Sequence, residues 1–320
     1  MPRQKFFALA AVLLIWVPAV DVPAQTDAGS DSRFFFSGDG HIHLFGKKNG
    51  RSFVGLYRTG SRNYHGQALE AICEVFDAPC KSPDTAVSLR LIEFLDRLQD
   101  RLAPGNRITI TSGYRSPQYN RKIASGGALA AKASLHQYGM AADVIMEGVP
   151  ARQLWDYVKA TGFGGAGYYH GETVHIDVGP ARSWDETTSG VGTGISDENK
   201  LIGLVTDFDR YRPQDTVTMQ FIRMTAFPID VAVEFALDRL DESNATGEVD
   251  HFAPKMGVPG DGDCRRFGNI AQMASIRWQL PADLPAGNYR VRARFCASPW
   301  DQMPAQIATP VFTVRHKPDF

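Results

Sequence analysis

Residues 185–200 divide this chain of 320 residues into two parts whose hydrophobic patterns differ. This stretch is rich in Thr, Ser, Gly, Asp and Glu, a composition typical of a linker or a disordered segment. Before it, strand-like and helical patterns alternate, whereas after it the apolar residues follow the two-residue period of strands. A chain of this length is expected to hold two domains. We therefore predict an α+β domain followed by a small all-β domain.

The N-terminus is typical of a secretory signal peptide. Arg3 and Lys5 precede an apolar run over residues 6–20, and small residues follow at positions 22–24. The run is shorter than the roughly 18–20 residues that span a bilayer, although an uncleaved anchor is the alternative. We predict a signal peptide over 1–24 and a polar linker over 25–32. The mature protein is then periplasmic or secreted, with no stable membrane anchor.

The four cysteines favour an oxidising compartment. Cys73 and Cys80 lie close together in the first part, and Cys264 and Cys296 lie in the second. Local pairing, Cys73–Cys80 and Cys264–Cys296, is the simplest of the three connectivities. A zinc site built from all four is the alternative, but no pair has the CxxC spacing that such sites use.

The first part contains both kinds of periodicity. Strand-like patterns occupy residues 33–57, 107–111, 141–146, 167–169 and 173–178, and helical patterns follow Ser82, Ser116 and Pro150. The longest helix is predicted to begin at Ser82 or Asp84 and to end at Pro104. We expect an antiparallel meander at the centre of this domain, which we assign to residues 33–184.

The hydrophobic pattern of the second part predicts strands throughout. The segments are 216–223, 230–237, 274–280, 288–295 and 309–314. Short strands at this spacing predict a small β-sandwich of the immunoglobulin or fibronectin type. We assign the linker to residues 185–204 and the sandwich to 205–320.

A metal-binding pattern lies in the first part. His136 in a loop is followed seven residues later by Asp143, which enters a strand, and Gly139 allows a tight turn between them. His175 lies on another strand. If the two strands pair antiparallel, the three side chains can converge into a zinc site with a free fourth position. The alternative is that these histidines are structural.

Three further side chains suit hydrolysis of a peptide bond. Glu172, three residues before His175, is the candidate general base, which would take a proton from water and give it to the departing amine. Asp177 lies on the same strand face as His175 and can orient an imidazole, or serve as the base instead. Arg115 follows a strand and is the candidate oxyanion stabiliser or substrate clamp, with a structural salt bridge as its alternative.

Together these motifs resemble the peptidase M15 superfamily, and within it the DUF882 branch, which contains murein endopeptidase K. The resemblance rests on residues 112–120 (SGYRSPQYN), 134–143 (SLHQYGMAAD) and 174–179 (VHIDVG) and runs from about residue 33 to 184. It implies a hedgehog/D,D-peptidase-like zinc domain. It implies that His136, Asp143 and His175 bind zinc, that Glu172 is the acid/base, and that Arg115 faces the cleft. Arg115, Tyr114 and Ser134 are our candidates for substrate binding.

The expected function is a zinc-dependent peptidase that acts on peptidoglycan stem peptides or cross-links. Carboxypeptidase and endopeptidase action both remain open. The alternative is a metal-containing module that recognises cell wall or protein without hydrolysis, and the second domain is a candidate for the same partners. The formal net charge of −1 gives no reason to expect a nucleic-acid partner.

Overall fold

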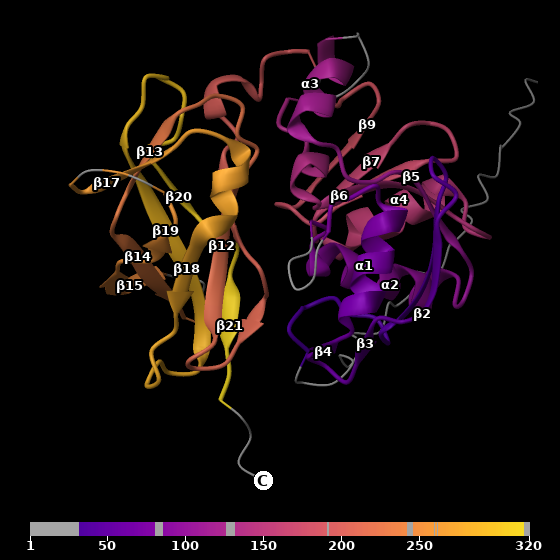
Figure 1. The fold of residues 1–320 in the computed structure, drawn as a ribbon, viewed down its shortest axis with the longest axis horizontal. Helices are drawn as coiled ribbons and strands as arrows, with labels where there is room; N and C mark the ends of the chain where they lie inside the picture. The colour runs from indigo at the N-terminus through magenta and orange to yellow at the C-terminus, as the bar shows by residue number, and fades with distance from the viewer. Residues whose placement is uncertain are drawn as a thin grey trace, which may run out of the picture.

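Two units lie side by side in the computed structural model (Figure 1). It describes residues 32–80, 86–125, 132–190, 192–241, 246–258, 260 and 262–316. The predicted signal peptide, most of the 25–32 linker and the two predicted helix caps, Ser82 and Asp84, lie outside these residues. Within the described part of the chain, no helix has the length and apolar character needed to cross a membrane.

The first unit is built on a sheet of seven strands in the order β2-β1-β5-β6-β8-β7-β9. The strands are β1 (His41–Gly46), β2 (Ser52–Leu56), β5 (Ile108–Ser112), β6 (Ala141–Met146), β7 (Gly165–Tyr168), β8 (Val174–Asp177) and β9 (Arg182–Asp185), and β3 (Arg58–Thr59) pairs with β4 (Asn63–Tyr64) separately. The four central strands pair antiparallel, as predicted, whereas β1–β5 and β7–β9 are parallel. The first unit is therefore of the predicted α+β class.

Four helices accompany this sheet: α1 (Gly66–Val75), α2 (Leu89–Leu102), α3 (Pro117–Ser125) and α4 (Ala151–Thr161). The prediction that α2 begins at Ser82 or Asp84 is wrong, because the helix begins at Leu89. Ser88, just before the helix, is extended, and its N–H donates to the carbonyl of Gly139 at 2.9 Å. Val87 is fully buried there, so its apolar character reflects packing rather than helical periodicity.

Helix α2 is buried on nearly all sides and carries a row of buried polar residues. Their side chains, three residues apart, are Arg90, Glu93, Asp96 and Gln99. Each has a specific partner, as buried polar groups require: Asp209 for Arg90, Arg58 for Glu93, Tyr57 for Asp96 and the backbone of His43 for Gln99. This row joins the helix to the N-terminal segment and to the second unit.

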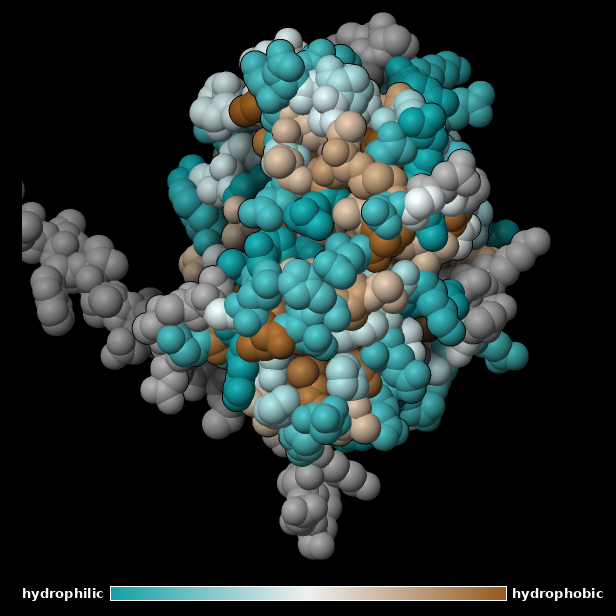
Figure 2. Space-filling model, turned by 90° about the vertical axis from the view of Figure 1, so that its left-hand side faces the viewer, coloured by the Kyte–Doolittle hydropathy of each residue, from teal (hydrophilic) through white to brown (hydrophobic). Residues whose placement is uncertain are grey.

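The second unit consists of two sheets that enclose one apolar core. One sheet has the order β10-β12-β18-β16, with strands Gly203–Thr206, Thr216–Ile222, Ile276–Gln279 and Lys255–Met256. The other holds β11 (Arg210–Tyr211), β13 (Ile229–Ala232), β14 (Phe235–Leu240), β15 (Thr246–Phe252), β17 (Cys264–Phe267), β19 (Gly287–Ala297), β20 (Gln306–Ala308) and β21 (Phe312–Val314). Hydrophilic and apolar residues are interspersed over its outer face (Figure 2). Its relation to the immunoglobulin type stays a prediction.

Both predicted disulfides are confirmed. Cys73 is bonded to Cys80 in the first unit, and Cys264 is bonded to Cys296 in the second. No described cysteine is free. Each bond therefore closes a loop within one unit, and neither links the two units covalently.

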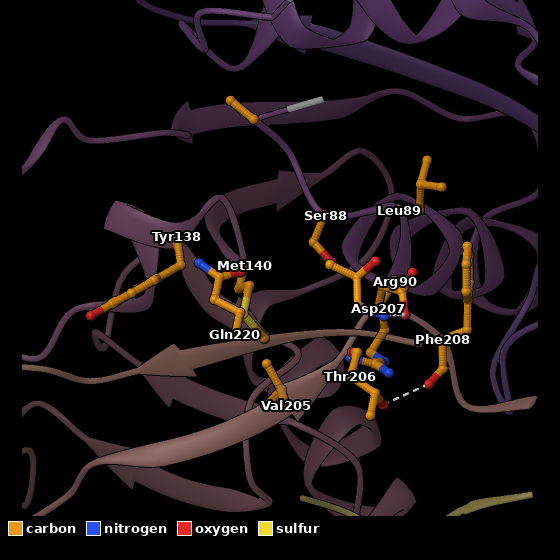
Figure 3. Close-up of a pocket in the computed structure, with 12 residues that line it drawn as sticks. Ser88, Leu89, Arg90, Tyr138, Met140, Val205, Thr206, Asp207, Phe208 and Gln220 are labelled. Atoms are coloured by element: carbon orange, nitrogen blue, oxygen red, sulfur yellow. Dashed lines mark hydrogen bonds between the residues drawn. The ribbon is translucent and has the colours of Figure 1, made fainter. Parts of the chain in front are cut away.

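The two units are joined by buried contacts. Arg90 of α2 forms a buried ion pair with Asp209 at 2.7 Å, and Val205 and Ile222 of the second unit pack into the core of the first. A cavity of about 230 Å³ lies between the units and is lined by residues of both, among them Tyr138 of the first and Gln220 of the second (Figure 3). The predicted linker holds a short 3-10 helix, Asp197–Asn199. The predicted domain boundaries remain predictions.

Asp96 gives the folded state a specific dependence on pH. Burial, together with the neighbouring Asp100 carboxylate, raises the pKa of Asp96 to about 8, although Tyr57 and the Gly40 N–H donate hydrogen bonds to it. In an unfolded chain this pKa is about 3.9. The stabilisation that comes from the protonated form is therefore complete below pH ~4 and is lost as the pH rises to about 8.

We expect Asp96→Asn to flatten the decline of unfolding free energy between pH 4 and 8, since asparagine resembles the protonated carboxyl. Denaturant unfolding over a pH series measures this slope. The matched control is Asp283→Asn, which changes an exposed carboxylate and should keep the wild-type slope. An unchanged slope in Asp96→Asn would contradict the assignment.

Candidate metal centre

The pairing of β6 with β8 brings the candidate ligands together. The two strands are antiparallel, with Asp143 directly opposite His175. His136 lies in the 3-10 helix Leu135–Tyr138, and Gly139 ends that helix with a φ of 62°, a left-handed conformation that glycine adopts without strain. The turn returns the chain to the start of β6, so that His136 faces the other two residues.

Three ligand atoms form a small triangle. His175 Nδ1 lies 3.0 Å from Asp143 Oδ1 and 3.3 Å from His136 Nε2, and His136 Nε2 lies 3.4 Å from Asp143 Oδ1. All three residues are buried. Nitrogen and oxygen ligands about 2.0–2.1 Å from a tetrahedral zinc ion lie about 3.3 Å from each other. The residues present therefore fit a zinc ion without rearrangement.

Hydrogen bonds fix both imidazoles in the tautomer that a metal requires. His136 Nδ1 lies 2.7 Å from the carbonyl of Gly113, which can only accept, so Nδ1 carries the proton and Nε2 keeps its lone pair. His175 Nε2 lies 3.0 Å from the carboxylate of Asp177, which leaves Nδ1 free to bind. Such acceptors behind metal-binding histidines are a regular feature of zinc sites.

Both carboxylate oxygens of Asp177 already accept hydrogen bonds. Besides His175, it accepts hydrogen bonds from the Gly179 N–H at 3.0 Å and from Arg182, whose Nη2 lies 2.6 Å away. Burial alone would raise the pKa of Asp177, but Arg182 and His175 hold it well below the usual range. The carboxylate therefore stays ionised and can keep His175 oriented.

Asp143 is oriented from its other side. Arg115 Nη2 lies 2.8 Å from Asp143 Oδ2, and the Arg115 Nε donates to Ser112 Oγ at 3.0 Å. Despite burial, the two histidines hold the pKa of Asp143 well below its ordinary value. Burial lowers the pKa of His136, which favours the neutral imidazole. Both shifts favour the protonation states in which these residues bind metal.

The structure brings five of the predicted site residues into one network, namely His136, Asp143, His175, Arg115 and Asp177. Glu172 is exposed in the turn between β7 and β8, outside this network. Ser134 precedes the 3-10 helix. Tyr114 lines a shallow depression with Glu74 and Asp77. The roles of these three residues stay predictions.

Several residues of the network had no role assigned from the sequence. Arg182 holds Asp177, Tyr169 donates to Asp143 Oδ1 at 3.3 Å, and the ring of Trp184 lies 5.5 Å from that of His175. Arg182 and Trp184 lie on β9, which is parallel to β7 and was not predicted. The sequence signal for Arg182, Trp184 and Tyr169 was that they lie in segments that match the family, at 182–184 and 164–169. Strand β9 has four residues and is too short to show a period.

Comparison with known proteins identifies the first unit. Residues 39–184 match the family Peptidase_M15_2, described as peptidoglycan L,D-endopeptidase MepK. This match supports the resemblance of the first unit to the peptidase M15 family. Over 95 residues the chain is 37% identical to MepK of Escherichia coli K12, which covers 29% of this chain and 52% of that protein. It is 38% identical over 80 residues to the probable MepK of Haemophilus influenzae, with 24% and 42% covered.

The chain thus spans about half the length of the curated relatives it matches. Among solved structures, domain 1 of VCBP3 from Branchiostoma floridae aligns with a TM-score of 0.22 and 12% identity, over 37% of this chain and 96% of that domain. A score this low carries no argument about the fold of either unit.

We expect the purified wild-type chain to hold about one zinc ion and His136→Ala to hold none, because removal of one of three ligands leaves too few to retain the metal. Elemental analysis after zinc loading at neutral pH measures the content. Thermal unfolding of the variant separates loss of metal from loss of fold. A wild-type chain that stays free of zinc would contradict the site.

Asp177→Asn should weaken zinc binding about 10- to 100-fold, since the neutral amide no longer supports the basicity of His175. Competition with a chromophoric chelator measures the affinity. The control is Asp156→Asn, which changes an exposed carboxylate on α4 and should leave zinc affinity unchanged. Equal affinities for all three proteins would show that Asp177 has no part in holding the metal.

Proposed function

We propose that this protein is a zinc-dependent endopeptidase that cleaves peptide cross-links of peptidoglycan in the cell envelope. The observation that carries the proposal is the buried triangle of His136 Nε2, Asp143 Oδ1 and His175 Nδ1, which fits zinc and lies in a unit that resembles the M15 family. The curated relatives are named peptidoglycan L,D-endopeptidases, which supports endopeptidase over carboxypeptidase action. A periplasmic location follows from such a substrate.

A zinc ion bound by these residues would polarise the scissile carbonyl and lower the pKa of a water molecule. Glu172 then has the role of general base, taking the proton of the attacking water and giving it to the departing amine. Asp177 is unsuited to that role, since its oxygens already accept from His175, Gly179 and Arg182. The exposed carboxylate of Glu172 is free to approach a bound substrate.

Arg115 is proposed to act in two ways. Its ion pair with Asp143 orients the ligand carboxylate, and its positive charge lies beside the ligand triangle, where a developing oxyanion would be stabilised. The predicted salt bridge and the predicted electrostatic role are thus compatible. Tyr114 and Ser134 remain candidates for contacts with the substrate peptide further from the metal.

We expect Glu172→Gln to lower the rate of cross-link hydrolysis by about 10²- to 10⁴-fold while zinc content stays at the wild-type level. Chromatography of muropeptides released from purified sacculi measures the rate. The matched control is Glu186→Gln, also an exposed glutamate after β9, which should keep full activity.

A recognition role without hydrolysis is the alternative outcome. If the zinc-loaded wild type and Glu172→Gln are equally inactive on sacculi and on isolated dimers, while an E. coli MepK control digests them, the hydrolytic proposal fails. Binding of zinc-loaded protein to sacculi in a sedimentation assay would then support the recognition module.

A further inference from the structure

A loop of the second unit reaches the metal-binding loop of the first. Met224, which follows β12, donates its backbone N–H to the hydroxyl of Tyr138 at 3.0 Å. Tyr138 lies two residues after His136 in the same 3-10 helix. The contact holds the neighbouring Arg223 near Gly179, two residues beyond Asp177.

Arg223 is held in an unfavourable backbone conformation. Its φ is 58°, in the left-handed region that arginine rarely adopts. Such strain persists where the surrounding structure imposes it and is concentrated at functional sites. Here the strain directs a long cationic side chain of the second unit towards the loop that follows β8.

The guanidinium of Arg223 has an unsatisfied donor. Its Nη2 is buried and has no hydrogen-bond partner among the described residues. This atom lies 3.7 Å from the point where a Cβ on Gly179 would be, two residues beyond Asp177. Burial, then the positive charge of Arg182, lower the pKa of Arg223 to about 10, still high enough to keep it charged at neutral pH.

The charges around Arg223 do not balance. Arg182 and Arg223 both lie near Asp177, but this carboxylate already pairs with Arg182, His175 and the Gly179 N–H. A partly buried guanidinium that faces a second one is costly unless an anion joins them. By contrast, Arg90 and Asp207 in the cavity between the units have hydrogen-bond partners in the chain (Figure 3).

We propose that Arg223 and Arg182 form a carboxylate-binding subsite where the two units meet, and that a carboxylate of the peptide substrate occupies it. The inference rests on the proposed function for the identity of the ligand. Guanidinium groups suit a carboxylate because their paired N–H donors match its two oxygens. The second unit thereby contributes a specificity-determining residue to a site whose metal ligands all belong to the first.

The test compares two probes, a cross-linked stem-peptide dimer with free carboxylates and the same dimer with these groups converted to carboxamides. Binding to the zinc-loaded full chain is measured by calorimetry in a Glu172→Gln background, so that turnover does not consume the probe. We expect the free-carboxylate dimer to bind about 10- to 100-fold more tightly than the carboxamide, as for hydrogen bonds to charged groups.

Arg223→Gln should bring the ratio of the affinities for the free-carboxylate and carboxamide dimers close to one. Carboxamide binding, zinc content and thermal stability should stay unchanged. Arg223→Lys should restore part of the preference, since it keeps the charge but not the paired donors. The control is Arg294→Gln, which changes an exposed arginine on β19 and should keep the full preference.

A preference that survives in Arg223→Gln, or an equal loss of affinity for both dimers, would overturn the subsite. Hydrolysis of both dimers at equal rates by the wild type would overturn the subsite and leave the proposed function intact. A preference lost in Arg223→Gln, in a protein that hydrolyses neither dimer, would support the subsite and overturn the proposed function.

Discussion

The register between β6 and β8 is the constraint on which the rest of the site depends. It sets Asp143 opposite His175, so two of the three ligand atoms are fixed by backbone pairing alone. A shift of either strand by one residue would put the two side chains on opposite faces of the sheet. Ala142, just before Asp143, and Ile176, just after His175, lie opposite each other and are fully buried, and they oppose such a shift because it would move an apolar side chain to the face that carries the polar site.

From this pair, a series of hydrogen bonds and ion pairs extends in two directions. His175 leads to Asp177, Asp177 to Arg182, and Arg182 to the vicinity of Arg223 in the second unit. On the other side, Asp143 leads to Arg115 and Ser112. Hydrogen bonds to charged groups contribute about 1.5–3 kcal/mol each. The candidate ligands are thus oriented by the fold itself, which would reduce the reorganisation that metal binding requires.

The sequence predicted those parts that depend on local pattern. The spacing of His136, Gly139 and Asp143 predicted a loop that turns into a strand, and β6 has the predicted bounds. It did not predict β9 or the start of α2, because short or buried segments lack a clear period. Arg223 could not be found either, since its approach to Gly179 depends on how two separate units pack.

The buried ion pair of Arg90 and Asp209 couples the stability of the two units. Helix α2 lies within the first unit, yet its Arg90 pairs with a carboxylate of the second, and separation of the units would break this pair. Val205 and Ile222 would lose their packing at the same time. The described chain should therefore unfold on heating in a single cooperative transition. Neither unit is expected to keep its full stability without the other.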